Sequence, residues 1–182
     1  MTTPWAAVIG VGNEFRHDDG IGPALATEVQ HRNLPGVRVV TTDGEPTGLL
    51  DAWADVTLAV VIDAVLCQPA MPGRVHRTTV DKLPPATGAA GTHGFGIPEA
   101  VELGRVLDRM PQQLIVYAVE ASDVSLGLGL SPPVATALPA LVDAVLGELG
   151  SMPPAALRSF RRWLGRRPPQ RSPSQTPRPR LR

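Results

Sequence analysis

The sequence predicts an α/β protein, a three-layer α/β/α sandwich with a twisted, mostly parallel five-stranded sheet. Short segments rich in β-branched residues alternate along residues 1–150 with longer segments whose apolar residues recur at helical spacing. The chain has 182 residues, 43% of them hydrophobic, which is enough for one domain with a full core. Strands that alternate with helices favour a parallel sheet with helices on both faces.

The first half of this pattern predicts three strands and two helices. Residues 5–11, 37–42 and 56–62 are short and rich in β-branched residues, as strands are. Residues 21–32 and 47–53, which separate them, have their apolar side chains at helical spacing. The order is therefore strand, helix, strand, helix, strand.

The second half predicts two more strands and two more helices. Residues 75–79 and 114–119 have strand composition, and residues 97–107 and 133–149 have helical spacing. A proline in the first turn of the last helix and a glycine at its end suit those positions. Because no helix separates 56–62 from 75–79, we expect one antiparallel strand in the sheet.

The charges divide the chain into an acidic domain, residues 1–150, and a basic Pro/Arg-rich tail, residues 151–182. The domain carries all 17 acidic residues and only eight of the 17 basic ones, and the tail carries the other nine, all arginine. From Pro168 on, the tail lacks the apolar residues that would offset the entropy lost on ordering, so we expect it to be largely disordered. Such a tail is able to contact nucleic acid, but we expect a solvated extension and no nucleic-acid partner.

The expected cellular compartment of the protein follows from its apolar runs, its N-terminal sequence and its cysteine content. No apolar run approaches the roughly 18–20 residues that span a bilayer, and the N-terminus lacks the pattern of a secretory signal. The chain has one cysteine, Cys67, so it forms no internal disulfide. We therefore expect a cytoplasmic protein without a membrane partner, and a monomer, because no zipper or obvious apolar interface is present.

The most informative stretch is VIGVGNEFRHDDGIG, residues 8–22. Gly10 and Gly12 match the start of the dinucleotide-binding fingerprint G-x-G-x-x-G, but Phe15 occupies the position of its third glycine. An acidic pair follows where a pyrophosphate would lie, and like charges repel. This stretch therefore argues against nucleotide binding.

Three polar residues are expected to meet at the carboxyl edge of the predicted sheet, where open α/β sheets bind ligands. Asp19 follows the first strand, Asp63 follows the third, and His93 lies in a glycine-rich loop before a helix. Two carboxylates and an imidazole suit a divalent first-row ion such as nickel, zinc or manganese. We therefore expect Asp19, Asp63 and His93 to form a metal site.

Simpler roles remain open for the same residues. Asp18 or Asp19 would serve as the N-cap of the helix that starts near residue 20, a common use of aspartate. Asp63 would cap the turn that follows its strand, and His93 would be an exposed loop residue. None of these assignments needs a metal.

The other histidines and the cysteine carry weaker expectations. His17, His31 and His76 are expected at the surface rather than in a metal site. Cys67 is expected to be a buried or half-buried small residue, because the sequence shows no basic partner that would activate its thiolate.

These motifs resemble the hydrogenase maturation endopeptidases, which trim the large subunits of nickel-iron hydrogenases. The family has a strand that runs into G-x-G-N, followed by an acidic pair and glycines. The matching residues are Gly10, Gly12, Asn13, Asp18, Asp19, Gly20 and Gly22. Further family motifs match, in order, Asp43-Gly44, Asp63-Ala64, Thr92-His93 and Leu130-Ser131-Pro132. The resemblance covers about residues 5–149.

The resemblance implies an endopeptidase that removes the C-terminal extension of a nickel-iron hydrogenase large-subunit precursor after nickel insertion. It implies that Asp19, Asp63 and His93 contact nickel, which we expect the precursor to supply. The family residue that corresponds to Asp19 is often glutamate, and the aspartate side chain is shorter than glutamate by one methylene group. The loop DGEPTG also departs from the D-G-G-T form of many members, and its Pro46 removes a backbone donor.

Two mechanisms and two other functions remain open at this point. Nickel would orient the scissile region and polarise the carbonyl or a water, or a carboxylate, Asp43 or Asp63, would activate water as a general base. The chain would alternatively be a nickel-dependent docking or chaperone-like module that binds the precursor without cutting it. A spore-type endopeptidase of related architecture would instead cut small acid-soluble proteins without nickel.

Overall fold

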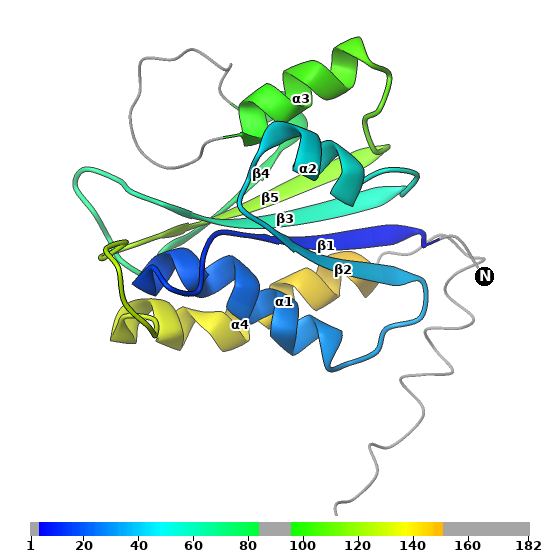
Figure 1. The fold of residues 1–182 in the computed structure, drawn as a ribbon. Helices are drawn as coiled ribbons and strands as arrows, with labels where there is room; N and C mark the ends of the chain where they lie inside the picture. The colour runs from blue at the N-terminus through cyan, green and yellow to red at the C-terminus, as the bar shows by residue number, and fades with distance from the viewer. Residues whose placement is uncertain (1–3, 84–95, 151–182) are drawn as a thin grey trace, which may run out of the picture.

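A computed structural model of the chain describes residues 4–83 and 96–150. Five strands form a single sheet in the order β2-β1-β3-β5-β4 (Figure 1). Their bounds are β1 Ala6–Val11, β2 Val37–Thr42, β3 Leu58–Val65, β4 Val75–Thr79 and β5 Gln113–Glu120. β4 runs antiparallel to β5, and the other neighbours are parallel. The mostly parallel five-stranded sheet and its one antiparallel strand are therefore confirmed.

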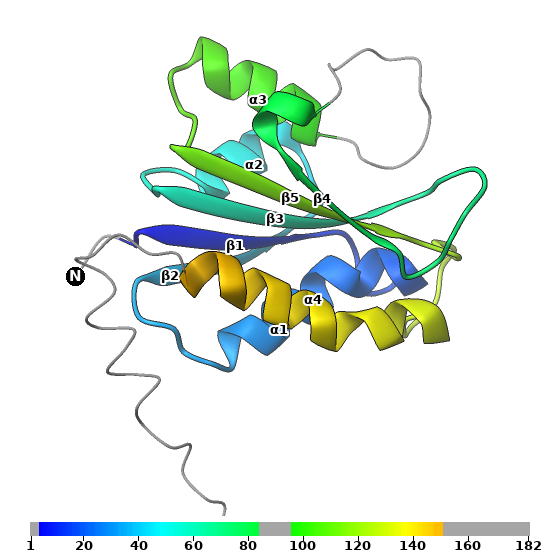
Figure 2. The ribbon, with the colours of Figure 1, turned by 180° about the vertical axis from the view of Figure 1, so that it is seen from behind.

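Helices cover both faces of the sheet, as the sequence predicts. Their bounds are α1 Ile21–Gln30, α2 Pro46–Ala52, α3 Ile97–Val106 and α4 Pro132–Gly150, with short 3-10 turns η1 His17–Gly20 and η2 Val80–Lys82. α1 and α4 lie on one face, and α2 and α3 lie on the other (Figures 1 and 2). The tail, residues 151–182, lies outside the described residues, so the division at residue 150 stays a prediction.

The central strands supply two separate cores because their side chains alternate between the faces of the sheet. Val8 and Val60 belong to the core beneath α1 and α4, whereas Ile9 and Val61 belong to the core beneath α2 and α3. All four side chains are fully buried, and full burial of a side chain of this size stabilises a fold by about 1.5–3 kcal/mol. The two helical layers are therefore held to the sheet independently of each other.

The helix α4 is the one described helix that is long and apolar enough to cross a membrane by length and composition. Its buried side chains belong to the core that it shares with α1 and the sheet. They are Val134, Leu141, Val142, Val145 and Leu149. Helices that pack in protein cores pass the same test, so this finding is weak support for a membrane span.

The strands β1 and β3 separate at the carboxyl edge of the sheet. β1 pairs with β3 only as far as Gly10 and Ile62, whereas β3 stays paired with β5 as far as Val65 and Glu120. The crossover through α1 lies on one face of the sheet and leads from β1 to β2, whereas the crossover through α2 lies on the other face and leads from β2 to β3 on the far side of β1, so the strand order reverses here. An opening at such a reversal is the usual ligand site of an open α/β sheet.

Candidate active site

Two glycines let the start of α1 touch the end of β1. A Cβ atom on Gly10 would lie 2.2 Å from the backbone oxygen of Gly22, and one on Gly22 would lie 2.2 Å from the backbone oxygen of Val11. Real side chains cannot approach backbone atoms so closely. The glycines therefore allow close backbone packing between β1 and α1, which is a role that needs no bound phosphate.

The neighbouring residues Asp18 and Asp19 have different surroundings. The Asp18 carboxylate is fully buried and accepts hydrogen bonds from the backbone N–H groups of Ser122 (2.8 Å), Asp123 (3.1 Å) and Ser131 (2.6 Å). The Ser131 hydroxyl donates a fourth bond at 2.9 Å. Asp18 thus anchors the loop between β5 and α4.

The N-cap interpretation of the acidic pair is wrong. The N-cap of α1 is Gly20, and no side chain caps it. Asp19 is half-buried, and its Oδ2 accepts a hydrogen bond from the Asn13 N–H at 2.9 Å. Asp18 and Asp19 both lie within the short turn η1, which precedes the helix, so one carboxylate faces the protein interior and the other faces the sheet edge.

Three carboxylates line one pocket of about 240 Å³ at the carboxyl ends of β1, β2 and β3. They belong to Asp19, Asp43 and Asp63. Asp19 and Asp63, two of the three residues expected to form a metal site, therefore lie in one pocket, as the sequence predicts. The other lining residues are Val11, Gly12, Asn13 and Arg16. The third expected ligand, His93, lies outside the described residues.

The Asp63 carboxyl group is the most perturbed group in this pocket. It is only 5% exposed, and burial raises its pKa to about 7, with the negative charge of Asp19 as a further contribution and a backbone hydrogen bond at Ala64 opposing both. Asp63 lies within β3 rather than at the end of a strand, so the turn-capping interpretation is wrong. A buried carboxyl group with such a pKa exchanges a proton readily at neutral pH.

The loop DGEPTG, which differs from the D-G-G-T form of many family members, forms the start of α2. Pro46 occupies the first turn of the helix, where no backbone donor is needed, and the Glu45 side chain accepts a hydrogen bond from the Gly48 N–H at 3.0 Å. The Asp43 side chain accepts one from the Glu45 N–H at 3.2 Å. The loop is therefore ordered by its own residues.

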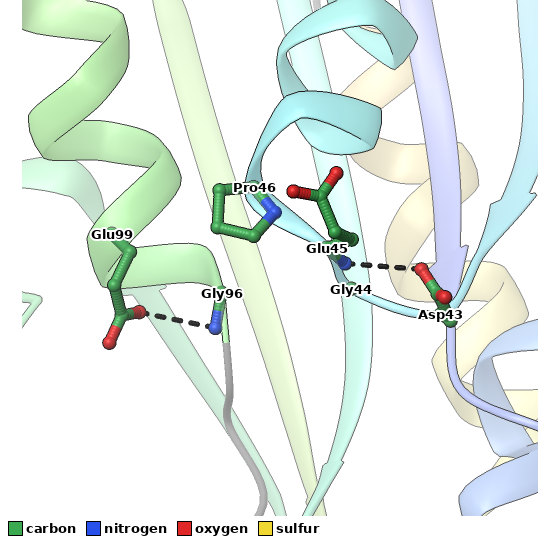
Figure 3. A pocket seen from close by; sticks show the side chains of 6 residues that line it. All are labelled: Asp43, Gly44, Glu45, Pro46, Gly96 and Glu99. Carbon is green, nitrogen blue, oxygen red and sulfur yellow. Dashed lines mark hydrogen bonds between the residues drawn. The ribbon is translucent and has the colours of Figure 1, made fainter.

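A second hollow of about 340 Å³ adjoins this loop (Figure 3). Gly96, at the start of α3, packs so closely on Gly44 that a Cβ atom on Gly96 would lie 1.7 Å from the Gly44 oxygen. Pro46, Glu99 and the exposed Asp43 also line the hollow. Because Asp43 lines both hollows, it lies where they meet.

Sequence reasoning missed Arg16, which brings a positive charge to the wall of the carboxylate pocket. Its position in the loop after β1 was the only available signal. Its backbone bridges to Gly127, in the loop that Asp18 anchors, so its placement depends on a distant segment.

Comparisons with known proteins support a single relationship. The family model described as "Hydrogenase maturation protease" matches residues 23–148. The hydrogenase expression/formation protein HupD of Bradyrhizobium diazoefficiens is 28% identical over 151 residues, or 79% of this chain and 78% of that protein. The hydrogenase 2 maturation protease of Escherichia coli is 24% identical over 145 residues, or 78% and 88%.

Two solved structures share the fold. The Escherichia coli hydrogenase maturating endopeptidase HybD superposes with a TM-score of 0.66 at 21% identity, over 79% of this chain and 91% of that one. The solution structure of an endopeptidase from Escherichia coli gives a TM-score of 0.71 at 23% identity, over 80% and 91%.

Proposed function

Because the chain belongs to the hydrogenase maturation protease family, we propose that it removes the C-terminal extension of a nickel-iron hydrogenase large-subunit precursor once nickel is in place. The observation that carries this proposal is the pocket at the sheet edge, where Asp19, Asp43 and Asp63 converge. Three carboxylates around one hollow attract a cation. A metal site whose coordination positions were all filled by this protein would not distinguish a nickel-loaded precursor from an empty one, whereas an open set of carboxylates leaves room for the precursor's own nickel.

We assign nickel recognition to Asp19, Asp63 and His93, with the metal supplied by the precursor. The shared pocket supports the first two. The third, His93, lies outside the described residues, and its assignment rests on the match of Thr92-His93 to the family motif. Nitrogen and oxygen ligands suit nickel.

We assign the general base to Asp43. Asp63 is buried and would face the cation of the loaded precursor, and a nearby positive charge lowers the pKa of a carboxyl group. Asp63 then gives up its proton as the loaded precursor binds and becomes a weaker base. Asp43 is exposed where the two hollows meet, so it is placed to take a proton from the attacking water and return it to the leaving amine.

The test mixes the full chain with nickel-loaded and nickel-free precursor and reads the precursor's C-terminus by mass spectrometry. We expect shortening of the loaded precursor only. Cleavage of both forms would refute the nickel requirement. Binding of loaded precursor without any cleavage would favour the docking module.

Aspartate variants test the two roles separately. Asp43→Asn should abolish cleavage and keep binding of the loaded precursor, whereas Asp63→Asn should weaken that binding. Asp143→Asn, an exposed position of α4 on the other face, is the matched control and should cleave normally. If Asp43→Asn still cleaves and Asp63→Asn binds without cleaving, Asp63 is the base instead.

A further inference from the structure

A second group of metal-binding side chains lies beyond the carboxylate pocket. Cys67, His76 and Glu120 place one ligand atom each within 4.8 Å of one another. They come from the loop after β3, from β4 and from the last residue of β5. Sulfur, imidazole nitrogen and carboxylate oxygen are the ligand atoms that proteins offer to zinc.

The register of β4 on β5 brings two of these side chains to one face of the sheet. His76 pairs with Ala118, and Glu120 lies two residues further along the same strand. Side chains two apart on a strand share a face, so His76 and Glu120 meet diagonally. His76 Nε2 lies 2.7 Å from Glu120 Oε1.

The Glu120 carboxylate is already oriented by the protein. It is only 3% exposed, and its second oxygen, Oε2, accepts a hydrogen bond from the Met71 N–H at 2.6 Å. Such backbone contacts to the free oxygen are typical of carboxylates that bind metals. The carboxylate therefore presents Oε1 toward His76 and Cys67.

The β3–β4 connection is held over the end of β5 by backbone hydrogen bonds. The Gly73 N–H donates a hydrogen bond to the backbone carbonyl oxygen of Glu120 at 2.8 Å, and the Glu120 N–H donates one to the backbone carbonyl oxygen of Arg74 at 2.9 Å. This pairing keeps the loop that carries Cys67 close to the carboxylate. Arg74 adds a positive charge nearby, but a thiolate and a carboxylate together still leave the group negative.

We propose that Cys67, His76 and Glu120 bind zinc or a similar borderline divalent ion, a site separate from the pocket of Asp19, Asp43 and Asp63. Three protein ligands leave the fourth position of a tetrahedral ion to water or another small ligand. His76 Nε2 and Glu120 Oε1 must move apart to roughly 3.3 Å, the spacing of two ligand atoms on a tetrahedral ion. The His76 side chain is 43% exposed, so its ring has room to make this movement.

The test titrates cobalt(II) into the untagged full chain, kept reduced, at mildly alkaline pH. Because the chain has one cysteine, a thiolate-to-cobalt charge-transfer band reports Cys67 alone. We expect this band to saturate at one cobalt per chain, to disappear when zinc is added, and to be absent from Cys67→Ser. Absence of the band from the folded chain would overturn the proposal.

Ligand variants test the rest of the set. His76→Gln and Glu120→Gln should each weaken cobalt binding at least about 10-fold, as loss of even an outer-shell partner does. The exposed Asp143→Asn and His31→Gln should leave cobalt binding unchanged, and circular dichroism should show that each variant is folded. Because buried Glu120 also supports the fold, His76→Gln decides: unchanged cobalt affinity in this variant refutes the site. None of these readouts depends on proteolysis, so the result stands apart from the proposed function.

Discussion

At the scale of single residues, adjacent aspartates perform different tasks. Asp18 satisfies backbone donors of a loop more than one hundred residues away, and Asp19 faces the pocket. A shared motif therefore contains one residue that supports the fold and one that belongs to the site.

Replacing Asp18 should destabilise the protein far more than replacing Asp19. In Asp18→Asn the side-chain amide takes the place of one carboxylate oxygen, which leaves a buried donor such as the Ser131 N–H unpaired. We expect a loss of about 1–3 kcal/mol in the free energy of unfolding, measured in urea. Asp19→Asn, at a half-buried position, should change it by less than about 1 kcal/mol. Equal effects of the two variants would contradict this assignment.

The buried Asp63 should make stability fall as the pH rises. Its folded pKa of about 7 exceeds the ordinary 3.8, so between these values the unfolded chain loses its proton first. The resulting loss of stability is fully developed above pH 7 and absent below the ordinary pKa, and its upper bound is about 4 kcal/mol.

Asp63→Asn removes this titration. Without added metal, we expect the variant to melt above the parent at about pH 8 and close to it at about pH 4. Asp43→Asn, at an exposed position of the same pocket, is the control and should show no such divergence. A constant difference between Asp63→Asn and the parent across this range would show that Asp63 keeps its ordinary pKa.

At the scale of elements, the close contact between β1 and α1 explains why glycine is needed at Gly10 and Gly22. Two helical glycines make a matched comparison. Gly147 in α4 has nothing within 4 Å of its missing Cβ, whereas Gly22 in α1 faces the backbone of Val11 and Ile62. Both positions would gain helix propensity from alanine.

The two substitutions should therefore have opposite signs. Gly147→Ala should raise the free energy of unfolding by about 0.5–1 kcal/mol. Gly22→Ala should lower it by about 3 kcal/mol or more, because backbone atoms cannot move aside as a flexible side chain can. Denaturant unfolding measures both, and a stabilised Gly22→Ala would disprove the close contact.

The separation of β1 from β3 also belongs to this scale. β3 continues beyond Ile62, where a strand was expected to end, because β5 remains as its hydrogen-bonding partner. This continuation places Asp63 inside a strand and beside an opening, which explains both its burial and its access to the pocket.

At the scale of the whole molecule, two groups of ligating side chains share one edge and one face of the sheet. Asp63 pairs with Ala118, and Glu120 lies two residues further along β5. The carboxylate pocket lies at the ends of β1, β2 and β3, whereas the Cys67–His76–Glu120 group lies where the β3–β4 connection meets the end of β5. One edge of the sheet therefore holds a candidate reaction site and a candidate resident-ion site.

The basic tail should be dispensable for folding. From Pro168 on, the sequence is rich in proline, arginine and serine and has few apolar side chains to add to a core. Deleting residues 168–182 should leave the melting temperature within about 2 °C of the full chain, measured by thermal denaturation. A drop of several degrees would show that the tail packs on the domain.

The sequence by itself determined the fold class, the order of elements and the meeting of Asp19 and Asp63 at one edge of the sheet. Periodicity and composition are local properties, and the carboxyl ends of parallel strands necessarily share one edge of a sheet. His93 and the tail stay predictions.

Only the tertiary structure decided what Asp18 binds, that Asp43 shares the pocket of Asp19 and Asp63, where β3 ends, and that Cys67, His76 and Glu120 meet. Each of these outcomes depends on contacts between segments that no local pattern links. Asp18 is turned inward by donors 104 to 113 residues away, and His76 reaches Glu120 across 44 residues through the register of β4 on β5. The direction of a polar side chain follows from such contacts, because a buried polar group turns toward the partner with which it forms a hydrogen bond.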